Sequence, residues 1–142
     1  MINKVTERHL QSLMKTLLLT STLTLSLMFS AGSWAEWTLV AEEVDGSSKN
    51  YVDVERIRKV DGLVYYWSLT DYLEPGPQLV MSFKSYWKVD CETMRGMPLS
   101  NSAYKLPMAE GTDIDSWTPD PEWQYAPPGS VAEVTLLAVC AH

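Results

Sequence analysis

Hydrophobic and polar residues alternate most clearly between Leu79 and Cys91. One set of alternating positions is apolar except for Ser85, and it comprises Leu79, Met81, Phe83, Trp87, Val89 and Cys91. The other set comprises Val80, Ser82, Lys84, Tyr86, Lys88 and Asp90. A period of two predicts a β-strand with one face in the core and the other toward solvent. Because Cys91 falls on the apolar face, we expect the element that covers this face to carry its disulfide partner.

Shorter patterns upstream predict further strands over residues 37–42 and 51–54. Asp53 is placed to cap a single helical turn before Ile57. Asp61-Gly62 lies between two apolar runs, a pattern typical of a tight β-hairpin. The return strand is predicted over residues 63–72. One of its faces carries Leu63, Tyr65, Trp67 and Leu69, and the other carries Val64, Tyr66, Ser68, Thr70 and Tyr72.

The pattern weakens after Cys91 and becomes clear again near the end of the chain. We expect a strand over residues 99–104 and a short one near Trp117. Ser130 and Glu133 form a capping box, which predicts a helix from Val131 to Cys140. Its buried stripe is expected to contain Leu136, Leu137 and Cys140. The sequence thus predicts an α+β fold, in which an antiparallel sheet of about six strands has a C-terminal helix packed on one face.

Residues 1–35 have the pattern of a secretory signal peptide. The uncharged stretch over residues 17–29 is preceded by Lys15 and followed by small residues at Ser33 and Ala35. This arrangement predicts cleavage between Ala35 and Glu36, and the stretch is too short to span a bilayer comfortably. Translation from Met14 would give a leader of ordinary length. No cysteine lies near the cleavage site, so we expect no lipid anchor and one mature domain, residues 36–142, that is soluble after export.

Charge and cysteine content restrict the function of this domain. The formal net charge of the whole chain is −7, and an acidic surface repels phosphate backbones and anionic lipids, which argues against nucleic-acid binding. The two cysteines, Cys91 and Cys140, should be paired because an exported chain enters an oxidising compartment. We therefore expect this disulfide to join the strand to the helix through the core.

Catalytic residue types are scarce. His9 lies within the predicted leader and His142 is the last residue, so neither a Ser/His/Asp nor a Cys/His arrangement is expected. We therefore predict no enzyme, no cofactor and no metal. The richest acidic group could in principle bind calcium or flank a sugar, but such a loop is ordinarily solvated; it contains Asp113, Asp115, Asp120 and Glu122. A basic group on the wet edge of the hairpin contains Arg56, Arg58 and Lys59.

Aromatic and cationic side chains are expected to share the sheet face opposite the helix. This candidate interface consists of Tyr66, Tyr72, Lys84, Tyr86 and Lys88. Such a mixture suits a protein partner or a second copy of the chain. A plain exposed sheet face would have the same pattern, and both interpretations stay open at this point.

The residues from position 37 onward resemble the surface-adhesin protein E family of Gram-negative bacteria. The resemblance rests on positions distributed in order along the chain: Trp37, Tyr51-Val-Asp53, Ile57, Trp67-Ser-Leu69, Asp71-Tyr72, Ser82, Lys84, Asp90-Cys91, Arg95, Gly111, Trp123, Pro128-Gly-Ser130 and Val139-Cys140. It implies a six-stranded antiparallel sheet with a helix packed on it, a Cys91–Cys140 bond and often a homodimer.

The resemblance also implies display at the cell envelope and binding of host proteins such as vitronectin and laminin. An adhesin must be held on the surface, often by a lipid on an N-terminal cysteine, and no such cysteine is present here. Two functions therefore follow. One is an exported, non-enzymatic binding module for host matrix or serum proteins. The alternative is a soluble periplasmic protein that maintains the envelope and has no host ligand.

Overall fold

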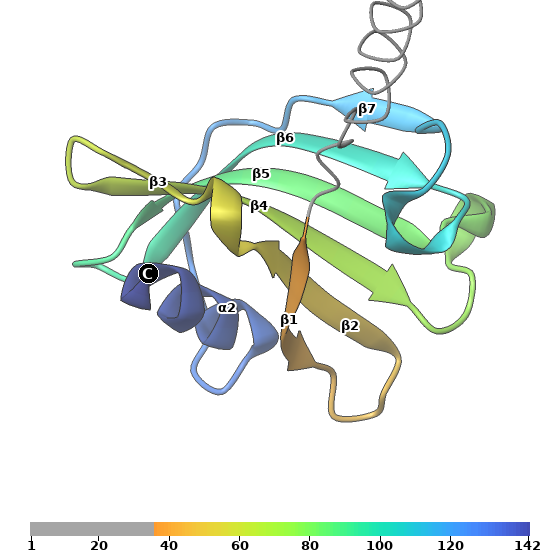
Figure 1. Cartoon of the computed structure of the whole chain (residues 1–142), viewed down its shortest axis with the longest axis horizontal. Coiled ribbons are helices and arrows are strands. Elements are labelled where there is room, and N and C mark those ends of the chain that lie inside the picture. The colour runs from red at the N-terminus through yellow and green to blue at the C-terminus, as the bar shows by residue number, and fades with distance from the viewer. Residues whose placement is uncertain (1–35) are drawn as a thin grey trace, which may run out of the picture. The chain divides into compact units, whose positions relative to one another are not determined.

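Antiparallel strands make up most of the computed structural model, which describes residues 36–142 (Figure 1). The main path of the sheet runs in the order β1-β2-β4-β5-β6-β7. Its strands are β1 (Trp37–Glu42), β2 (Ser48–Asp53), β4 (Leu63–Tyr72), β5 (Ser82–Asp90), β6 (Arg95–Tyr104) and β7 (Asp115–Trp117). The predicted antiparallel sheet is confirmed. The predicted signal peptide and the Ala35 side of its cleavage site lie outside the described residues.

Two short strands lie off the main path and extend it to eight strands. Strand β3 (Arg58–Val60) pairs with the first part of β4, whereas β2 pairs with its second part. Strand β8 (Gln124–Tyr125) pairs with the start of β6, and β7 pairs with its later part. The outer edge of β4 is therefore paired with two separate strands, and so is the outer edge of β6.

The Asp61-Gly62 hairpin between β3 and β4 is confirmed. Both residues have positive φ, 51° and 78°, as a two-residue type I′ hairpin turn requires. The helical turn expected after Asp53 is η1 (Val54–Arg56), but the Asp53 side chain does not cap it. Instead its carboxylate is 1% exposed and lies 3.2 Å from Nε of Arg56.

Strand β6 is longer than expected, since it begins at Arg95 rather than Leu99 and contains Pro98. Its pairing with β5 shifts by one residue, because Tyr86 faces Ser100 while the next residue, Trp87, faces Pro98. Leu99 is therefore an extra residue in β6 and forms a β-bulge. A bulge is one of the few places where a strand accepts proline.

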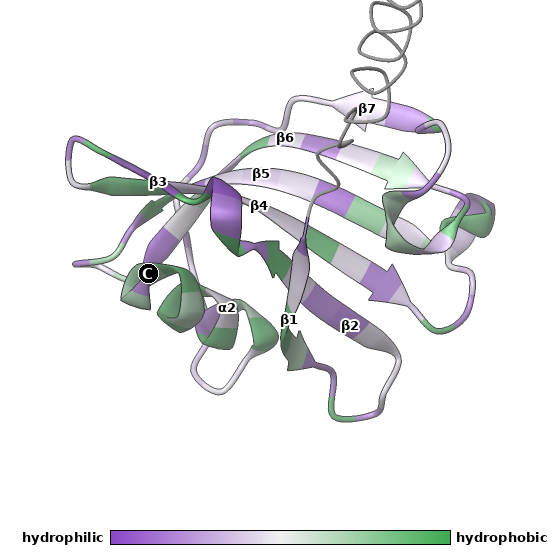
Figure 2. Ribbon diagram, in the orientation of Figure 1, coloured by the Kyte–Doolittle hydropathy of each residue, from purple (hydrophilic) through white to green (hydrophobic). Residues whose placement is uncertain are grey.

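Helix α2 (Val131–Ala141) begins as predicted. The backbone N–H of Glu133 donates to Oγ of Ser130 at 3.2 Å, whereas its carboxylate accepts from the N–H of Gly129, one residue earlier than the predicted box. Hydrophobic residues run along the helix (Figure 2). Leu136 is buried, but Leu137 is 56% exposed; the prediction that Leu137 belongs to the buried stripe was wrong. No helix in residues 36–142 has the length and hydrophobicity needed to cross a membrane.

The core lies between α2 and one side of the sheet, here called the helix face. Its buried cluster consists of Val52, Val64, Tyr66, Val89, Leu136 and Val139. The predicted disulfide is confirmed: Cys91 and Cys140 are bonded, with their Cα atoms 5.8 Å apart. Trp87, Val89 and Cys91 face the helix as expected. Leu79 does not, since it lies in the η2 turn (Pro77–Leu79) and is 63% exposed.

The side of the sheet opposite α2, here called the far face, differs from the prediction. Tyr66 pairs directly with Trp87, and directly paired residues point to the same side of a sheet. Tyr66 therefore lies on the helix face, where it is 4% exposed, and Tyr72 lies on the same side by alternation. Placing Tyr66 and Tyr72 on the far face was wrong.

The two faces of β4 were exchanged in the prediction for a physical reason: the far face is itself partly covered. The η3 turn (Pro107–Ala109) crosses one end of it. There the N–H of Met108 donates to the Asp71 carboxylate and the N–H of Ala109 donates to Oγ of Ser82. Leu69, predicted to face the helix, is fully buried on this other side. Both faces of β4 therefore bury apolar residues, so hydrophobicity alone does not identify the face that the helix covers.

Candidate functional site

Aromatic rings and cationic side chains meet on the far face of β4 and β5. The rings of Trp67 and Tyr86 lie 4.8 Å apart between centroids, and Tyr65 lies 6.3 Å from Tyr86. Nζ of Lys84 lies 5.2 Å from the Trp67 ring and 5.5 Å from the Tyr104 ring. Cation–π contacts of this kind hold a lysine over an aromatic surface while its charge remains near solvent.

A residue distant in sequence completes this surface. Trp123, just before β8, lies beneath two cations: Lys88 at 5.2 Å and Arg95 at 4.6 Å from its ring centroid. Arg95 also donates two hydrogen bonds to Oδ2 of Asp90, at 3.1 and 3.2 Å. The C-terminal segment is thereby attached to the far face. We call the whole set the aromatic–cation surface: Tyr65, Trp67, Lys84, Tyr86, Lys88, Arg95 and Trp123.

The Asp90 carboxylate shapes the turn between β5 and β6. It accepts hydrogen bonds from the Thr93 hydroxyl at 2.7 Å and from the N–H groups of Glu92 and Thr93. The hydrogen bond from Thr93, followed by weaker contributions that include Arg95, lowers the pKa of Asp90 below its usual range. Asp90 therefore stays ionised as a partner for Arg95.

Three of the predicted interface residues, Lys84, Tyr86 and Lys88, lie together on the far face. Tyr66 and Tyr72 do not join them. Sequence reasoning placed Tyr65 and Trp67 together on one face of the strand but took that face as the core side, and it did not include Trp123 in the interface. Alternation shows which residues share a face, but no local pattern indicates which face the helix covers or where Trp123 packs.

The acidic loop and the basic group predicted from the sequence lie in different parts of the domain. In the acidic loop, Asp115 belongs to β7, and Asp113 accepts a hydrogen bond from the Ser116 hydroxyl; all four carboxylates are exposed. Within residues 36–142, no group of three or more His, Cys, Asp and Glu side chains is placed to hold a metal ion. In the basic group, Arg58 pairs directly with Tyr65 and so borders the aromatic–cation surface.

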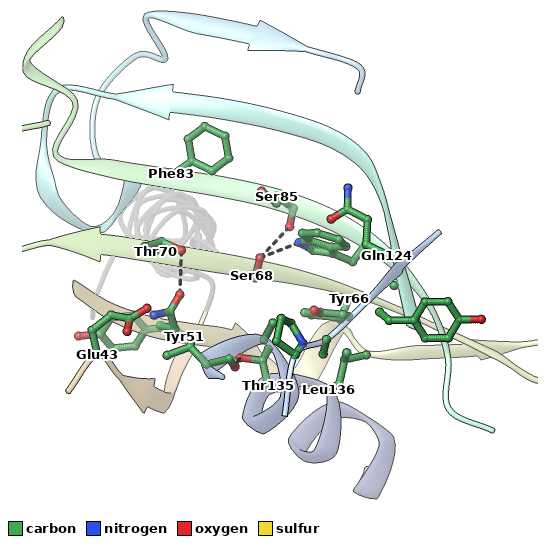
Figure 3. A pocket seen from close by; sticks show the side chains of 18 residues that line it. Glu43, Tyr51, Tyr66, Ser68, Thr70, Phe83, Ser85, Gln124, Thr135 and Leu136 are labelled. Atoms are coloured by element: carbon green, nitrogen blue, oxygen red, sulfur yellow. Dashed lines mark hydrogen bonds between the residues drawn. The ribbon is translucent and has the colours of Figure 1, made fainter. Parts of the chain in front are cut away.

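A cavity of about 420 Å³ opens on the helix face, beside the first turns of α2 and the segment around β8 (Figure 3). Tyr66 and Ser85 form part of the sheet wall, and Thr135 and Leu136 come from the helix. Gln124 lies on the β8 side. Burial raises the pKa of the Tyr66 hydroxyl still further above physiological pH, and the protonated group can donate a hydrogen bond into the cavity.

Comparison with known proteins identifies the family. The family model described as "Surface-adhesin protein E" matches residues 37–141, which is nearly all of the described domain. The chain belongs to the surface-adhesin protein E family. A search of curated proteins found no significant match.

Solved structures agree on the fold of this family member. Two structures of Haemophilus influenzae protein E, the first of them crystal form II, match with TM-scores of 0.56 and 0.55, each at 15% sequence identity. Both matches cover 76% of this chain, and they cover 89% and 86% of the respective solved chains. Protein E from non-typeable Haemophilus influenzae matches with a TM-score of 0.54 at 13% identity, over 78% of this chain and 79% of that one. At this level of identity the likeness concerns the fold.

Proposed function

We propose that this chain is an exported, non-enzymatic binding module that captures host matrix or serum proteins through the aromatic–cation surface. Its membership of a surface-adhesin family supports binding as the function. The observation that carries the proposal is the close contact between the tilted rings of Trp67 and Tyr86, flanked by Lys84 and Lys88 on the far face. All four side chains are only half-buried.

Such a surface has the composition of a binding hot spot. Tryptophan, tyrosine and arginine contribute most to measured interfaces, because they cover a large contact area at low cost in side-chain entropy. The surface concentrates cations on a protein whose overall charge is negative. It therefore suits an acidic segment of a partner, and the association should weaken as salt concentration rises.

Paired charge variants test this surface without disturbing the core. Lys84→Gln with Lys88→Gln should lower affinity for immobilised laminin or vitronectin, with the loss mainly in the association rate. The matched control is Lys59→Gln with Lys105→Gln, which removes the same charge from exposed positions elsewhere. Surface plasmon resonance at two salt concentrations provides the measurement. Equal affinities for the two double variants would contradict the proposal.

A ring variant tests the aromatic part. Trp67→Ala should weaken capture by about 1 kcal/mol or more, roughly fivefold, while circular dichroism reports an intact sheet. Asp113→Asn with Asp115→Asn, in the acidic loop, should leave capture unchanged. If the acidic-loop variant loses capture and Trp67→Ala does not, the wrong surface has been chosen.

Location on the cell separates this proposal from its alternative. Biotinylation of intact cells should label the protein if it is displayed at the surface. Protection from the reagent until the outer membrane is opened would favour a periplasmic protein that maintains the envelope. Sedimentation of the purified domain shows whether the same surface pairs two copies, because Trp67→Ala would then also shift a dimer toward monomer.

A further inference from the structure

The cavity on the helix face is separate from the surface proposed for protein capture, since the sheet lies between them. Its volume of about 420 Å³ falls within the range of small-molecule sites, roughly 300–1,000 Å³. Strands β2, β4 and β5 supply one wall, α2 supplies another, and residues 124–127 border it. Most of its polar groups are hydroxyls and amides rather than charges.

Several of these polar groups lack a partner within residues 36–142. The hydroxyls of Tyr66 and Ser85 and the side-chain amide of Gln124 make none of the hydrogen bonds found in that part of the chain. Tyr66 and Ser85 are only 4% and 5% exposed. Neither hydroxyl oxygen is among the fully buried, unpartnered side-chain atoms of residues 36–142, so both oxygens remain accessible from the cavity. Because all three groups line the cavity, a ligand there could supply these partners.

A second row of polar groups retains spare capacity. The Thr70 hydroxyl donates to Oδ1 of Asn50 at 2.9 Å, which leaves the NH₂ group of Asn50 available as a donor (Figure 3). Both residues line the same cavity. The cavity can therefore donate and accept hydrogen bonds at several points on one ligand.

An ordered aromatic residue forms part of the wall. The indole Nε1–H of Trp87 donates to Oγ of Ser68 at 3.1 Å. The ring also rests against Gly96, where an added Cβ would lie 3.3 Å from Cε3 of Trp87. With the hydrogen bond on one side and the glycine backbone on the other, the ring keeps its orientation. Phe83 lines the cavity from the same strand.

The charges that line the cavity favour a neutral ligand over an anion. Among the described residues that line the cavity, Glu43 is the only acidic residue, and none is Lys, Arg or His. An anion would find no counter-charge there and would be repelled by Glu43. A ligand with hydroxyl groups at its edge and an apolar C–H face matches both the polar groups and the aromatic wall.

We infer that this cavity binds a neutral carbohydrate of one or two sugar rings, stacked against Trp87 and hydrogen-bonded by Tyr66, Ser85 and Gln124. This site is additional to the surface proposed for protein capture. A binding module with both sites could hold the sugar portion of a glycoprotein as well as its polypeptide.

The test uses the folded domain and three defined probes: lactose, cellobiose and N,N′-diacetylchitobiose. At least one should shift the NMR signals of the Trp87 indole N–H and of the Tyr66 and Ser85 amides. Tyr66→Phe keeps the buried ring and removes only the hydroxyl, and Gln124→Ala changes an exposed residue. Each should weaken binding roughly two- to tenfold, the loss expected for one hydrogen bond.

Controls separate this site from the far face. Trp67→Ala should leave sugar binding unchanged, and Tyr66→Phe should leave laminin and vitronectin capture unchanged, so either proposal can fail without the other. The carbohydrate assignment is overturned if none of the three probes shifts these signals. It is also overturned if Tyr66→Phe and Gln124→Ala bind as tightly as wild type, or if glucuronic acid binds more tightly than the neutral sugars.

Discussion

Removing the disulfide should destabilise the domain by about 4 kcal/mol. The perturbation is Cys91→Ala with Cys140→Ala, or reduction of the wild-type bond. The bonded residues are 49 positions apart, and in the chain-entropy treatment a closed loop of this length restricts the unfolded chain by about 4 kcal/mol at 25 °C. The folded state retains Leu136 and Val139 in the core, so helix α2 should remain docked.

Urea denaturation followed by tryptophan fluorescence measures the effect. Small domains lose about 1–3 kcal/mol of stability per molar urea, so a loss of about 4 kcal/mol lowers the midpoint by roughly 1.5–4 M. Reductant should lower the wild-type midpoint by a similar amount. The same reductant should leave the double variant unaffected, which controls for any other action of the reagent.

One outcome would refute the reasoning. If thiol alkylation confirms complete reduction and the free energy of unfolding changes by less than about 1 kcal/mol, the bond does not restrict the unfolded chain. A large loss of stability with an altered dependence on urea would instead show that reduction changes how compact the unfolded chain is.

Three further predictions concern the helix, the turn and the mature end. Leu136→Ala should cost about 2–5 kcal/mol in urea denaturation because Leu136 is buried, whereas Leu137→Ala, at an exposed position of the same helix, should cost much less. The carboxylate of Asp90 has a lowered pKa, so its stabilising contribution is complete above the unfolded-state pKa and is lost as pH falls through the folded-state value. In an NMR titration Thr93→Ala should raise the pKa of Asp90, and an unchanged value would contradict the assigned cause. Mass spectrometry of exported protein should find Glu36 as the first residue and no acyl chain; a lipid-modified end would disprove the predicted cleavage.

Local patterns predicted the parts of the fold that local physics determines. The Asp61-Gly62 turn depends on two neighbouring residues with positive φ. The start of α2 depends on the Ser130 hydroxyl within one helical turn. The bond between Cys91 and Cys140 followed from the presence of only two cysteines in a chain expected to be exported. None of these features requires knowledge of how distant strands align.

The candidate site depended on alignment between distant residues and was only partly predicted. Residues 73–81 join β4 to β5, and a connection of that length does not determine the register as a two-residue turn does. The face shared by Tyr66 and Trp87 therefore could not be inferred. Trp123 reaches Lys88 and Arg95 from a segment without periodicity, so the complete surface was visible only in the structure.

The position of α2 in the chain has a consequence for biogenesis. The helix follows every strand, yet it supplies Leu136 and Val139 to the core and Cys140 to the disulfide. While the chain is being synthesised, the preceding strands can form only incomplete, exposed assemblies until residues 131–141 emerge. Such late closure depends on contacts far apart in sequence, which slows folding. If the predicted leader directs export, slow folding would keep the precursor extended longer, which is the form in which a polypeptide can be threaded through a narrow translocation channel.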